Sequence, residues 1–390
     1  MTGHGSSGQG TGGSGFDGGS ESYDGVPFSS QDFHQPYCEI NDYGNINEVR
    51  NCYLVTLNDL DGGKDYVRGK IADYFNDLIN IGVSGFRVDA SKHMWPGDID
   101  AIQSRTRDVS GGGKALFFHE VIDMGGEPIG VQEYFGVGKV TEFRYGIKLA
   151  ECIRGGDFNC LGGIYDQVSY DCHFSVLNLT LQGWGMADGM HAVVFVDNHD
   201  NQRGHGGGGG VMTASGPGHN DWQYKIGAAF LLAHDYGFKR LMSSYYFDNT
   251  DQGPPGSQPN SFPNECGNGW TCEHRFSNFI FSEILLNDNK NFRWSSILNM
   301  VRFSNAAVGT GVENWEGGNN YLGFSRGNKA FVAMGDLNRE FYTGLPDGEY
   351  CDIIQDCQQK IQVHMATQQL VIITTKLFSD KWRKGIFQCS

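Results

Sequence analysis

From about residue 61 onward, the spacing of the apolar positions switches between a helical and a strand-like pattern. Residues Asp65–Ile81 place five apolar side chains on one helical face, which predicts an amphipathic helix ended by Gly82. These side chains are Val67, Ile71, Phe75, Leu78 and Ile79. Gly85–Val88 (GFRV) then predicts a short buried strand, and further short apolar runs predict strands at residues 115–118, 140–143, 192–196 and 240–244. Helical stretches such as Gln223–Ala233 lie between several of these runs, so the order predicts a parallel α/β architecture.

The two ends of the chain follow different patterns. Residues 1–60 are rich in Gly and Ser and then polar, a composition that fits a flexible linker as well as a folded domain. Cys38 and Cys52 argue against pure disorder there. After about residue 310 the apolar positions alternate and turn sequences such as Arg326-Gly327-Asn328 separate them, which predicts a small all-β module. The expected domains are therefore residues 1–60, 61–310 and 311–390.

Composition narrows the classes of function. The 390 residues carry a formal net charge of −16, which disfavours binding to nucleic acid or to acidic lipid headgroups. No run of about 18 apolar residues occurs, so no membrane span is expected. The ten cysteines form no CxxC pair, which argues for disulfides in an oxidising compartment and against a zinc site. A neutral substrate such as a carbohydrate is compatible with all of this.

Acidic residues follow three of the predicted strands. Asp89, Glu120 and Asp200 each come at or just after the end of an apolar run, with Arg87 and His199 close by in sequence. A single buried acid of this kind is more often part of a structural ion pair. In a parallel barrel, however, the carboxyl ends of the strands carry the chemistry, and three such acids favour an active site. Two carboxyl groups about 5 Å apart are what cleavage of a glycosidic bond with retention requires.

The segments around these acids resemble a known family. GFRVDASKHMWP (85–96), FFHEVIDMGGE (117–127) and VFVDNHDNQRGHG (194–206) resemble three of the four sequence signatures of the alpha-amylase family of glycoside hydrolases. The first is close to the animal, chloride-dependent form, and similarity extends from residue 1 to about 357. The resemblance implies an α/β fold: an incomplete (β/α)8 TIM barrel with an inserted loop domain and a C-terminal β-sandwich.

The resemblance also implies roles for individual residues. Asp89 would be the nucleophile, Glu120 the general acid/base and Asp200 the residue that stabilises the transition state. The implied substrate-binding residues are Lys92, His93, His199 and His205. The implied reaction is endo-hydrolysis of alpha-1,4-glucosidic bonds, with starch, glycogen and maltooligosaccharides as substrates.

Two ions and three disulfides come with the family. A structural calcium would be held by the carboxylate of Asp59 and by the main-chain carbonyls of Arg50 and His93. An activating chloride would be held by Arg87, Asn198 and Arg240 and would raise the pKa of the neighbouring acid. The simpler reading of Arg87 is that it pairs with a nearby acid. The implied disulfides are Cys38–Cys52, Cys266–Cys272 and Cys351–Cys357.

The chain also departs from the family pattern. It begins where the loop domain begins, so the first three barrel strands and a signature with a calcium-binding Asn are expected upstream of Met1. A chain truncated at that point is expected to fold poorly and to lack activity, because the open sheet leaves an unpaired edge. Residues 168–182 and 276–293 look like foreign insertions with ends that fit intron borders, and the tail after Cys357 does not match the family.

These patterns predict a secreted monomer that acts on glucans, without nucleic-acid or membrane partners. One rival is a related glucosidase or transglycosylase, which the stretch DASKHMWPGD disfavours. The other is a truncated, inactive carbohydrate-binding relative. Retention of all three acids argues against inactivation by point changes.

Overall fold

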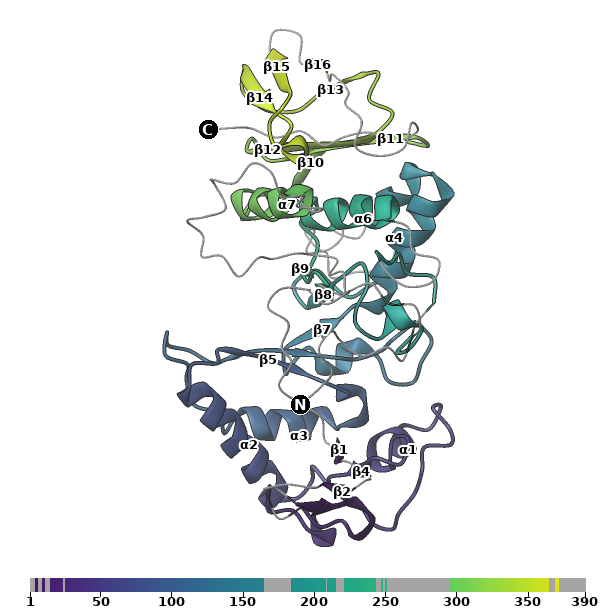
Figure 1. Cartoon of the computed structure of the whole chain (residues 1–390), viewed down its shortest axis with the longest axis vertical. Coiled ribbons are helices and arrows are strands. Elements are labelled where there is room, and N and C mark those ends of the chain that lie inside the picture. Colours follow the sequence, from purple (N-terminus) through teal and green to yellow (C-terminus); the bar gives the residue numbers. More distant parts are fainter. Residues whose placement is uncertain are drawn as a thin grey trace, which may run out of the picture. The chain divides into compact units, whose positions relative to one another are not determined.

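The computed structural model describes residues 4–5, 9–10, 15–23, 25–164, 184–207, 209–214, 221–242, 247, 250, 295–364 and 369–371 (Figure 1). The chain divides into two compact units. The first comprises Met1–Phe143 with Met190–Val193, and the second comprises Arg144–Gly189 with Val194–Ser390. Each unit is described by itself below.

The N-terminal part of the first unit contains little regular structure. Strand β1 (His4–Gly5) pairs antiparallel with β4 (Asn58–Asp59), and β2 (Gln9–Gly10) pairs with β3 (Phe16–Asp17). Short 3-10 turns, η1 (Gly18–Ser20) and η2 (Ser30–Asp32), and helix α1 (Ile46–Asn51) complete this part. The predicted disulfide between Cys38 and Cys52 is confirmed. It ties the segment before α1 to the C-terminal end of that helix.

Helices α2 (Asp65–Asn80) and α3 (Pro96–Gln103) pack together on one apolar core. The predicted face of α2 is confirmed, since Val67, Ile71, Phe75 and Ile79 are buried, whereas Leu78 is half-buried at its margin. The aromatic rings of Phe75, Phe86 and Phe117 lie 4.7–5.4 Å apart, centroid to centroid, and link α2 to the strands behind it. Gly82 has φ +108° and ends the helix as expected.

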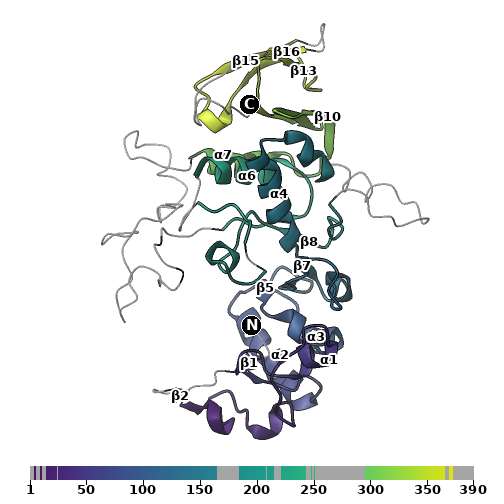
Figure 2. The same cartoon turned by 90° about the vertical axis from the view of Figure 1, so that its right-hand side faces the viewer.

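The strands form a sheet of order β5-β6-β7-β8-β9, of which Figure 2 labels β5, β7 and β8. Their bounds are β5 (Gly85–Val88), β6 (Leu116–His119), β7 (Lys139–Thr141), β8 (Ala192–Val194) and β9 (Phe238–Lys239). The successive pairs from β5 to β8 are parallel, with Val88 opposite His119 and His119 opposite Val140. Parallel pairing of strands joined through helices confirms the predicted α/β class.

The last strand was predicted too far along the chain. The apolar pattern predicts a strand at residues 240–244, whereas β9 covers Phe238–Lys239. The Arg240 amide still donates to the Val194 carbonyl at 2.9 Å, but Leu241 and Met242 lie outside any strand. Hydrogen bonding to β8, rather than side-chain polarity, therefore sets the end of the strand.

The second unit combines helices with two antiparallel sheets. Helices α4 (Phe143–Gly155), α6 (Asp221–Ala233) and α7 (Ser295–Ala306) precede them, with turn η5 (Phe158–Leu161) after α4. One sheet has the order β10 (Val312–Gly318), β11 (Tyr321–Arg326), β12 (Ala330–Gly335). The other has the order β13 (Glu340–Phe341), β16 (Gln369–Val371), β15 (Lys360–His364), β14 (Gly348–Cys351), with turn η7 (Ile353–Gln355) between β14 and β15. Residues of both sheets share one core, which includes Phe331, Phe341 and Ile361.

Two disulfides lie in the second unit. Cys351–Cys357 is confirmed, and Cys152–Cys160, which joins α4 to η5, was not predicted. The predicted pair Cys266–Cys272, the two suspected insertions and the end of the tail lie outside the described residues.

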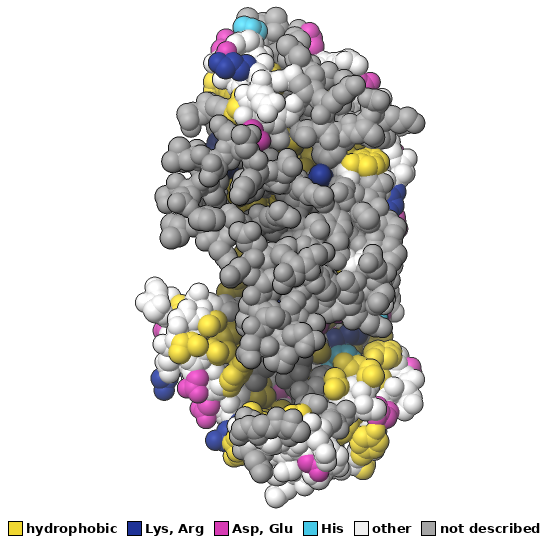
Figure 3. All heavy atoms as spheres, viewed as in Figure 1, with side chains coloured by type: hydrophobic (Ala, Val, Ile, Leu, Met, Phe, Trp, Pro, Cys, Tyr) yellow, Lys and Arg dark blue, Asp and Glu magenta, His cyan; other side chains and the backbone are white. Residues whose placement is uncertain are grey.

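No helix in the described part of the chain has the length and apolar character needed to cross a membrane. On the face drawn in Figure 3, the acidic and basic side chains of the described residues are interspersed over the surface.

Candidate active site

Two predicted catalytic carboxylates are neighbours because of the register of two strands. Asp89 follows the last residue of β5, and Glu120 follows the last residue of β6. Since Val88 lies opposite His119 in this parallel pair, the two acids leave the sheet side by side at its carboxyl edge. Glu120 is buried, and the side chain of Asp89 is 36% exposed. One acid is therefore more shielded from water than the other.

Arg87 connects these two carboxylates. Its guanidinium forms an ion pair with Asp89 and a second one with Glu120, at 2.9 Å. Arg87 and Asp89 are two residues apart along an extended segment, which places both side chains on the same face. Burial raises the pKa of Asp89, but the charge and hydrogen bond of Arg87 and a hydrogen bond from Glu120 outweigh it, so the pKa lies below its ordinary value. Asp89 is thus held ionised.

The turn after Asp89 is bonded to Glu120. The Ala90 amide donates to a carboxylate oxygen of Glu120 at 2.9 Å, and the Ser91 amide donates to the Glu120 carbonyl at 3.0 Å. Ala90 has φ 49° and ψ 33°, a left-handed conformation that is unfavourable for a residue with a Cβ atom. These bonds offset part of that cost.

Lys92 and His93, predicted to contact substrate, use their side chains within the protein. Lys92 Nζ donates to the Ile122 carbonyl at 2.8 Å and forms an ion pair with Glu127. Burial lowers the pKa of Lys92, while the charge of Asp123 acts in the opposite direction. The Nδ1 atom of His93 lies 2.9 Å from the Val49 carbonyl, and burial lowers the pKa of its imidazole. Both residues therefore tie the loop after β5 to neighbouring segments.

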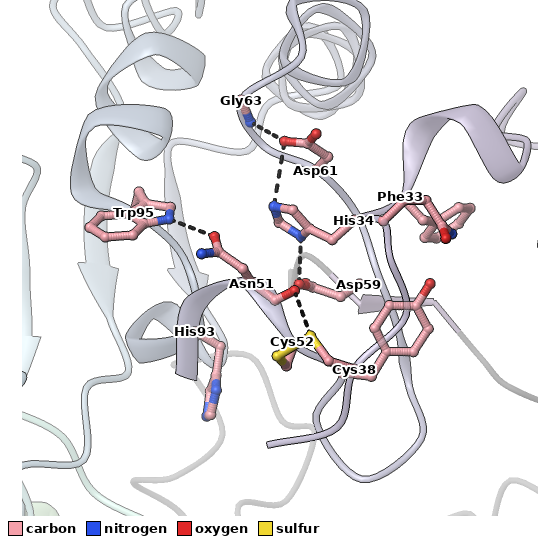
Figure 4. A network of polar contacts seen from close by, with 12 residues as sticks. Phe33, His34, Cys38, Asn51, Cys52, Asp59, Asp61, Gly63, His93 and Trp95 are labelled. Carbon is pink, nitrogen blue, oxygen red and sulfur yellow. Dashed lines mark hydrogen bonds and ion pairs between the residues drawn. A yellow bond between two sulfur atoms is a disulfide. The ribbon is translucent and has the colours of Figure 1, made fainter. Parts of the chain in front are cut away.

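The predicted calcium ligand Asp59 is buried beside a histidine. Its carboxylate lies 2.7 Å from His34 Nδ1, and His34 Nε2 lies 3.4 Å from a carboxylate oxygen of Asp61 (Figure 4). Burial raises the pKa of Asp59 to about 6, although the hydrogen bond and charge of His34 act in the opposite direction. Burial lowers the pKa of His34, but the hydrogen bond and charge of Asp59 outweigh it, so this pKa is raised. Both shifts favour a proton held between the two side chains, and the sequence did not reveal His34.

Arg50, whose carbonyl is the second predicted calcium ligand, has a buried side chain with several partners. Its guanidinium donates to Glu133 at 2.9 Å and to the Tyr134 hydroxyl at 3.1 Å, and it lies 4.7 Å from the centre of the Trp95 ring. The Trp95 indole donates in turn to Asn51 in α1 (Figure 4). These contacts anchor the C-terminal end of α1 against the segment that carries His93.

The donor chemistry of this region suits a hard cation. Arg50 lies in the last turn of α1 and His93 ends the 3-10 turn η3 (Ser91–His93), so both carbonyls belong to helix ends that lack helical partners. These carbonyls and the buried Asp59 carboxylate are all oxygen donors, the kind that calcium prefers. Among the described residues, no three His, Cys, Asp or Glu side chains gather as a metal site. A site made of one carboxylate and main-chain carbonyls does not need such a cluster.

The remaining predicted site residues belong to the second unit. The Asn198 side-chain oxygen accepts from the amides of Asp200 and Asn201, at 3.0 and 2.8 Å, so the donor NH2 group takes no part in these two bonds. His199 Nε2 lies 3.3 Å from the Asp200 carboxylate, and the amide of the exposed His205 donates to the Asp200 carbonyl. Asn198 and Asp200 thus share one compact turn.

Two further residues of this unit have a clear structural role. A Cβ at Gly206, which has φ +54°, would lie 3.0 Å from the Cβ of Asp200, so glycine is required for this approach. Arg240 lies directly after β9, where its amide is bonded to β8. Guanidinium and amide donors are the groups that an anion such as chloride requires.

Comparisons with known proteins agree with this geometry. No family model matches the chain. The chain is 46% identical to an alpha-amylase of Pecten maximus over 91% of its own length and 67% of the relative, and 44% identical to one of Tribolium castaneum over the same shares. It thus spans about two thirds of the length of these relatives.

Solved structures give the same result. The crystal structure of alpha-amylase I from Eisenia fetida matches with a TM-score of 0.77 and 36% identity, over 100% of this chain and 79% of that one. A Glu-to-Gln variant of the same earthworm protein, solved with maltohexaose, matches with a TM-score of 0.78. Sequence identity, shared fold and the paired carboxylates at adjacent strand ends agree, and the chain belongs to the alpha-amylase family of glycoside hydrolases.

Proposed function

We propose that the protein hydrolyses internal alpha-1,4-glucosidic bonds of starch, glycogen and maltooligosaccharides with retention of anomeric configuration. The observation that carries the proposal is the contact of one guanidinium, that of Arg87, with both Asp89 and Glu120. The two carboxyls also hydrogen-bond to each other, and such closeness supports retention, because an inverting enzyme has a wider spacing that admits a water molecule between them.

The environments of the two acids suit different steps. Asp89, kept ionised by Arg87, attacks the anomeric carbon and forms a covalent glycosyl ester as the glycosidic bond breaks. Glu120 gives its proton to the departing oxygen in the same step. It then takes a proton from water, whose oxygen attacks the anomeric carbon and releases Asp89. Glu120 is buried and Asp89 is partly exposed, so the two acids stand in different surroundings, as their different roles require.

Other residues would bind the sugar. Asp200 would hydrogen-bond sugar hydroxyls and stabilise positive charge on the ring, with His199 beside it. His205 is exposed and precedes the glycine run, so it can approach a bound chain. Lys92 and His93 would act mainly by holding the loop after β5, since their side chains bond within the protein.

Two ions complete the proposal. Calcium would be held by Asp59 and the carbonyls of Arg50 and His93, where it would join α1 to the turn after β5. Chloride would be held by Arg87, Asn198 and Arg240 and would add a negative charge that favours protonation of a neighbouring carboxyl. Both assignments rest on the family resemblance, and the oxygen donors of the first set and the N–H donors of the second support them.

The remaining proposals concern organisation. We propose a loop domain at residues 1–60, barrel elements at 61–310 and a β domain from 311, in a secreted monomer that does not act on nucleic acid or membranes. Disulfides Cys38–Cys52, Cys152–Cys160 and Cys351–Cys357 support an oxidising compartment. The net charge of −16 supports a neutral substrate.

The experiment is hydrolysis of an end-blocked maltoheptaoside by the 390-residue chain with calcium, with and without chloride. Cleavage should give the alpha anomer as the first product, as followed by proton NMR. Replacement of the acid/base, E120Q, is expected to reduce kcat by about 10²–10⁴-fold. A beta anomer as first product would overturn the retaining mechanism. Binding of maltohexaose without any cleavage would favour the inactive carbohydrate-binding alternative.

A further inference from the structure

His119 is a buried histidine that directly precedes Glu120 and has a partner at each ring nitrogen. Its exposed fraction is 0%, and it ends strand β6. The Nδ1 atom lies 3.0 Å from the Ser91 hydroxyl, and Nε2 lies 3.1 Å from the Val137 carbonyl. A side-chain amide, that of Gln103, also lies 3.2 Å from Nε2. The ring thus spans from the turn after β5 to the segment before β7.

The protonation of this ring follows from its partners. Burial lowers the pKa of His119 to about 4, although the hydrogen bond to Val137 acts in the opposite direction, so the ring is neutral near pH 7. A neutral ring carries one N–H, and if Nε2–H donates to the Val137 carbonyl, Nδ1 is an acceptor for the Ser91 hydroxyl. The Ser91 hydroxyl also has the Val88 carbonyl as an acceptor at 3.0 Å, so its single proton is shared between these two acceptors.

The residue that His119 holds through Ser91 belongs to the strained turn beside the carboxylates. Ala90, in its left-handed conformation, directs its amide to the Glu120 carboxylate, and the Ser91 amide binds the Glu120 carbonyl. A left-handed alanine relaxes unless its surroundings hold it. The contact between Ser91 and His119, together with the bond from the Ser91 hydroxyl to the Val88 carbonyl, anchors this turn.

We propose that His119 is a positioning residue that holds the Ala90–Ser91 turn, and through it the relative placement of the Asp89 and Glu120 carboxyls. The proposal rests on the proposed function for its catalytic consequence, and on the hydrogen bonds alone for its structural part. His119 does not touch the reacting atoms.

The catalytic test uses H119L, which keeps most of the volume but removes both ring nitrogens. We expect kcat on the blocked maltoheptaoside to fall by about 10–100-fold, with a much smaller change in KM, because misplaced carboxyls affect the transition state most. H119Q, which restores a donor toward Val137, should recover part of the loss. S91A should also lower kcat. The fold-loss in kcat of the double variant H119L/S91A should be smaller than the product of the two single fold-losses.

The matched control is His234, another fully buried histidine, which lies in the second unit. H234L should lower the melting temperature without a comparable loss of kcat. The proposal is overturned if kcat of H119L stays within about twofold of that of the unmodified protein. It is also overturned if the losses in activation free energy of H119L and S91A are additive in the double variant.

A second readout does not depend on turnover. Amide hydrogen exchange at Ala90 and Ser91, whose N–H groups bind Glu120, should accelerate in H119L and not in H234L. Unchanged protection of these two amides would refute the proposal. If the unmodified protein hydrolyses no glucan, the proposed function fails, and the exchange result still decides the role of His119.

Discussion

The Nδ1 atom of His34 lies 2.7 Å from a carboxylate oxygen of Asp59. This contact fixes the orientation of the buried carboxylate. The same imidazole reaches Asp61 through its other nitrogen, at 3.4 Å. A ligand whose orientation is fixed by a hydrogen bond binds its ion better than one that must be ordered on binding. His34 is therefore expected to matter for calcium although it is not itself a predicted ligand.

Replacement of His34 by alanine should weaken calcium binding. We expect the dissociation constant of the metal-free protein for calcium to rise by about 10–100-fold, because Asp59 loses the partner that orients it. Calorimetric titration at constant pH measures this directly. K64A is the matched control, because the partly exposed Lys64 forms an ion pair with Asp61, at 3.3 Å, in the same cluster. Equal calcium affinity in H34A and K64A would contradict the prediction.

Replacement of Arg87 by glutamine should shift the acidic limb of the pH–activity profile. Arg87 holds the pKa of Asp89 below its ordinary value, so loss of the guanidinium raises that pKa and protonates the nucleophile at a higher pH. The acidic limb of kcat/KM should therefore move toward neutral pH. R87K keeps the charge without the two-sided fork and should move it less. An unmoved acidic limb in an active R87Q protein would show that Arg87 does not control Asp89.

Removal of the disulfide between Cys38 and Cys52 should affect both stability and calcium. The bond closes a loop with a sequence separation of 14 residues, for which the chain-entropy model gives a loss of about 3 kcal/mol. The double variant C38S/C52S should unfold at lower urea and bind calcium more weakly, since this bond fixes the end of α1. Removal of Cys152–Cys160, with a separation of 8, is the matched control. Its removal should lower the free energy of unfolding by a similar amount and leave calcium affinity unchanged. If both removals weakened calcium binding equally, the link between Cys38–Cys52 and the calcium site would be refuted.

Burial of His234 should make stability depend on pH on the acidic side. Burial lowers the pKa of His234 to about 3, against 6.5 for an ordinary histidine, although the charge of Asp235 acts in the opposite direction. The folded state therefore binds fewer protons than the unfolded state between these values. Its stability falls as pH drops from about 6.5 toward 3, by at most about 1.4 kcal/mol per pH unit.

H234L should flatten this part of the stability curve and leave the curve above about pH 7 parallel to that of the unmodified protein. Unfolding by urea at a series of pH values measures the slope. Identical slopes in the two proteins would show that His234 titrates in the same way folded and unfolded.

Local sequence patterns were sufficient for several elements. The helical spacing of Val67, Ile71 and Phe75 identified α2, because burial of one helical face leaves a period that is visible within a single window. The strand carrying Gly85–Val88 was found for a similar reason. Asp89 and Glu120 were found because acids directly after apolar strands are unusual, and the family resemblance supplied their roles.

The sequence alone thus determined which acids end the strands and which helical face is buried, and the family resemblance supplied the disulfides Cys38–Cys52 and Cys351–Cys357. Only the tertiary structure decided the partners of those residues. His34 reaches Asp59 across 25 residues, His119 reaches Ser91 across 28 and Arg50 reaches Tyr134 across 84. Such bonds depend on strand register and helix packing, which leave no periodic pattern in the sequence. For the same reason the contact of Arg87 with Glu120 became visible only when β5 and β6 were aligned.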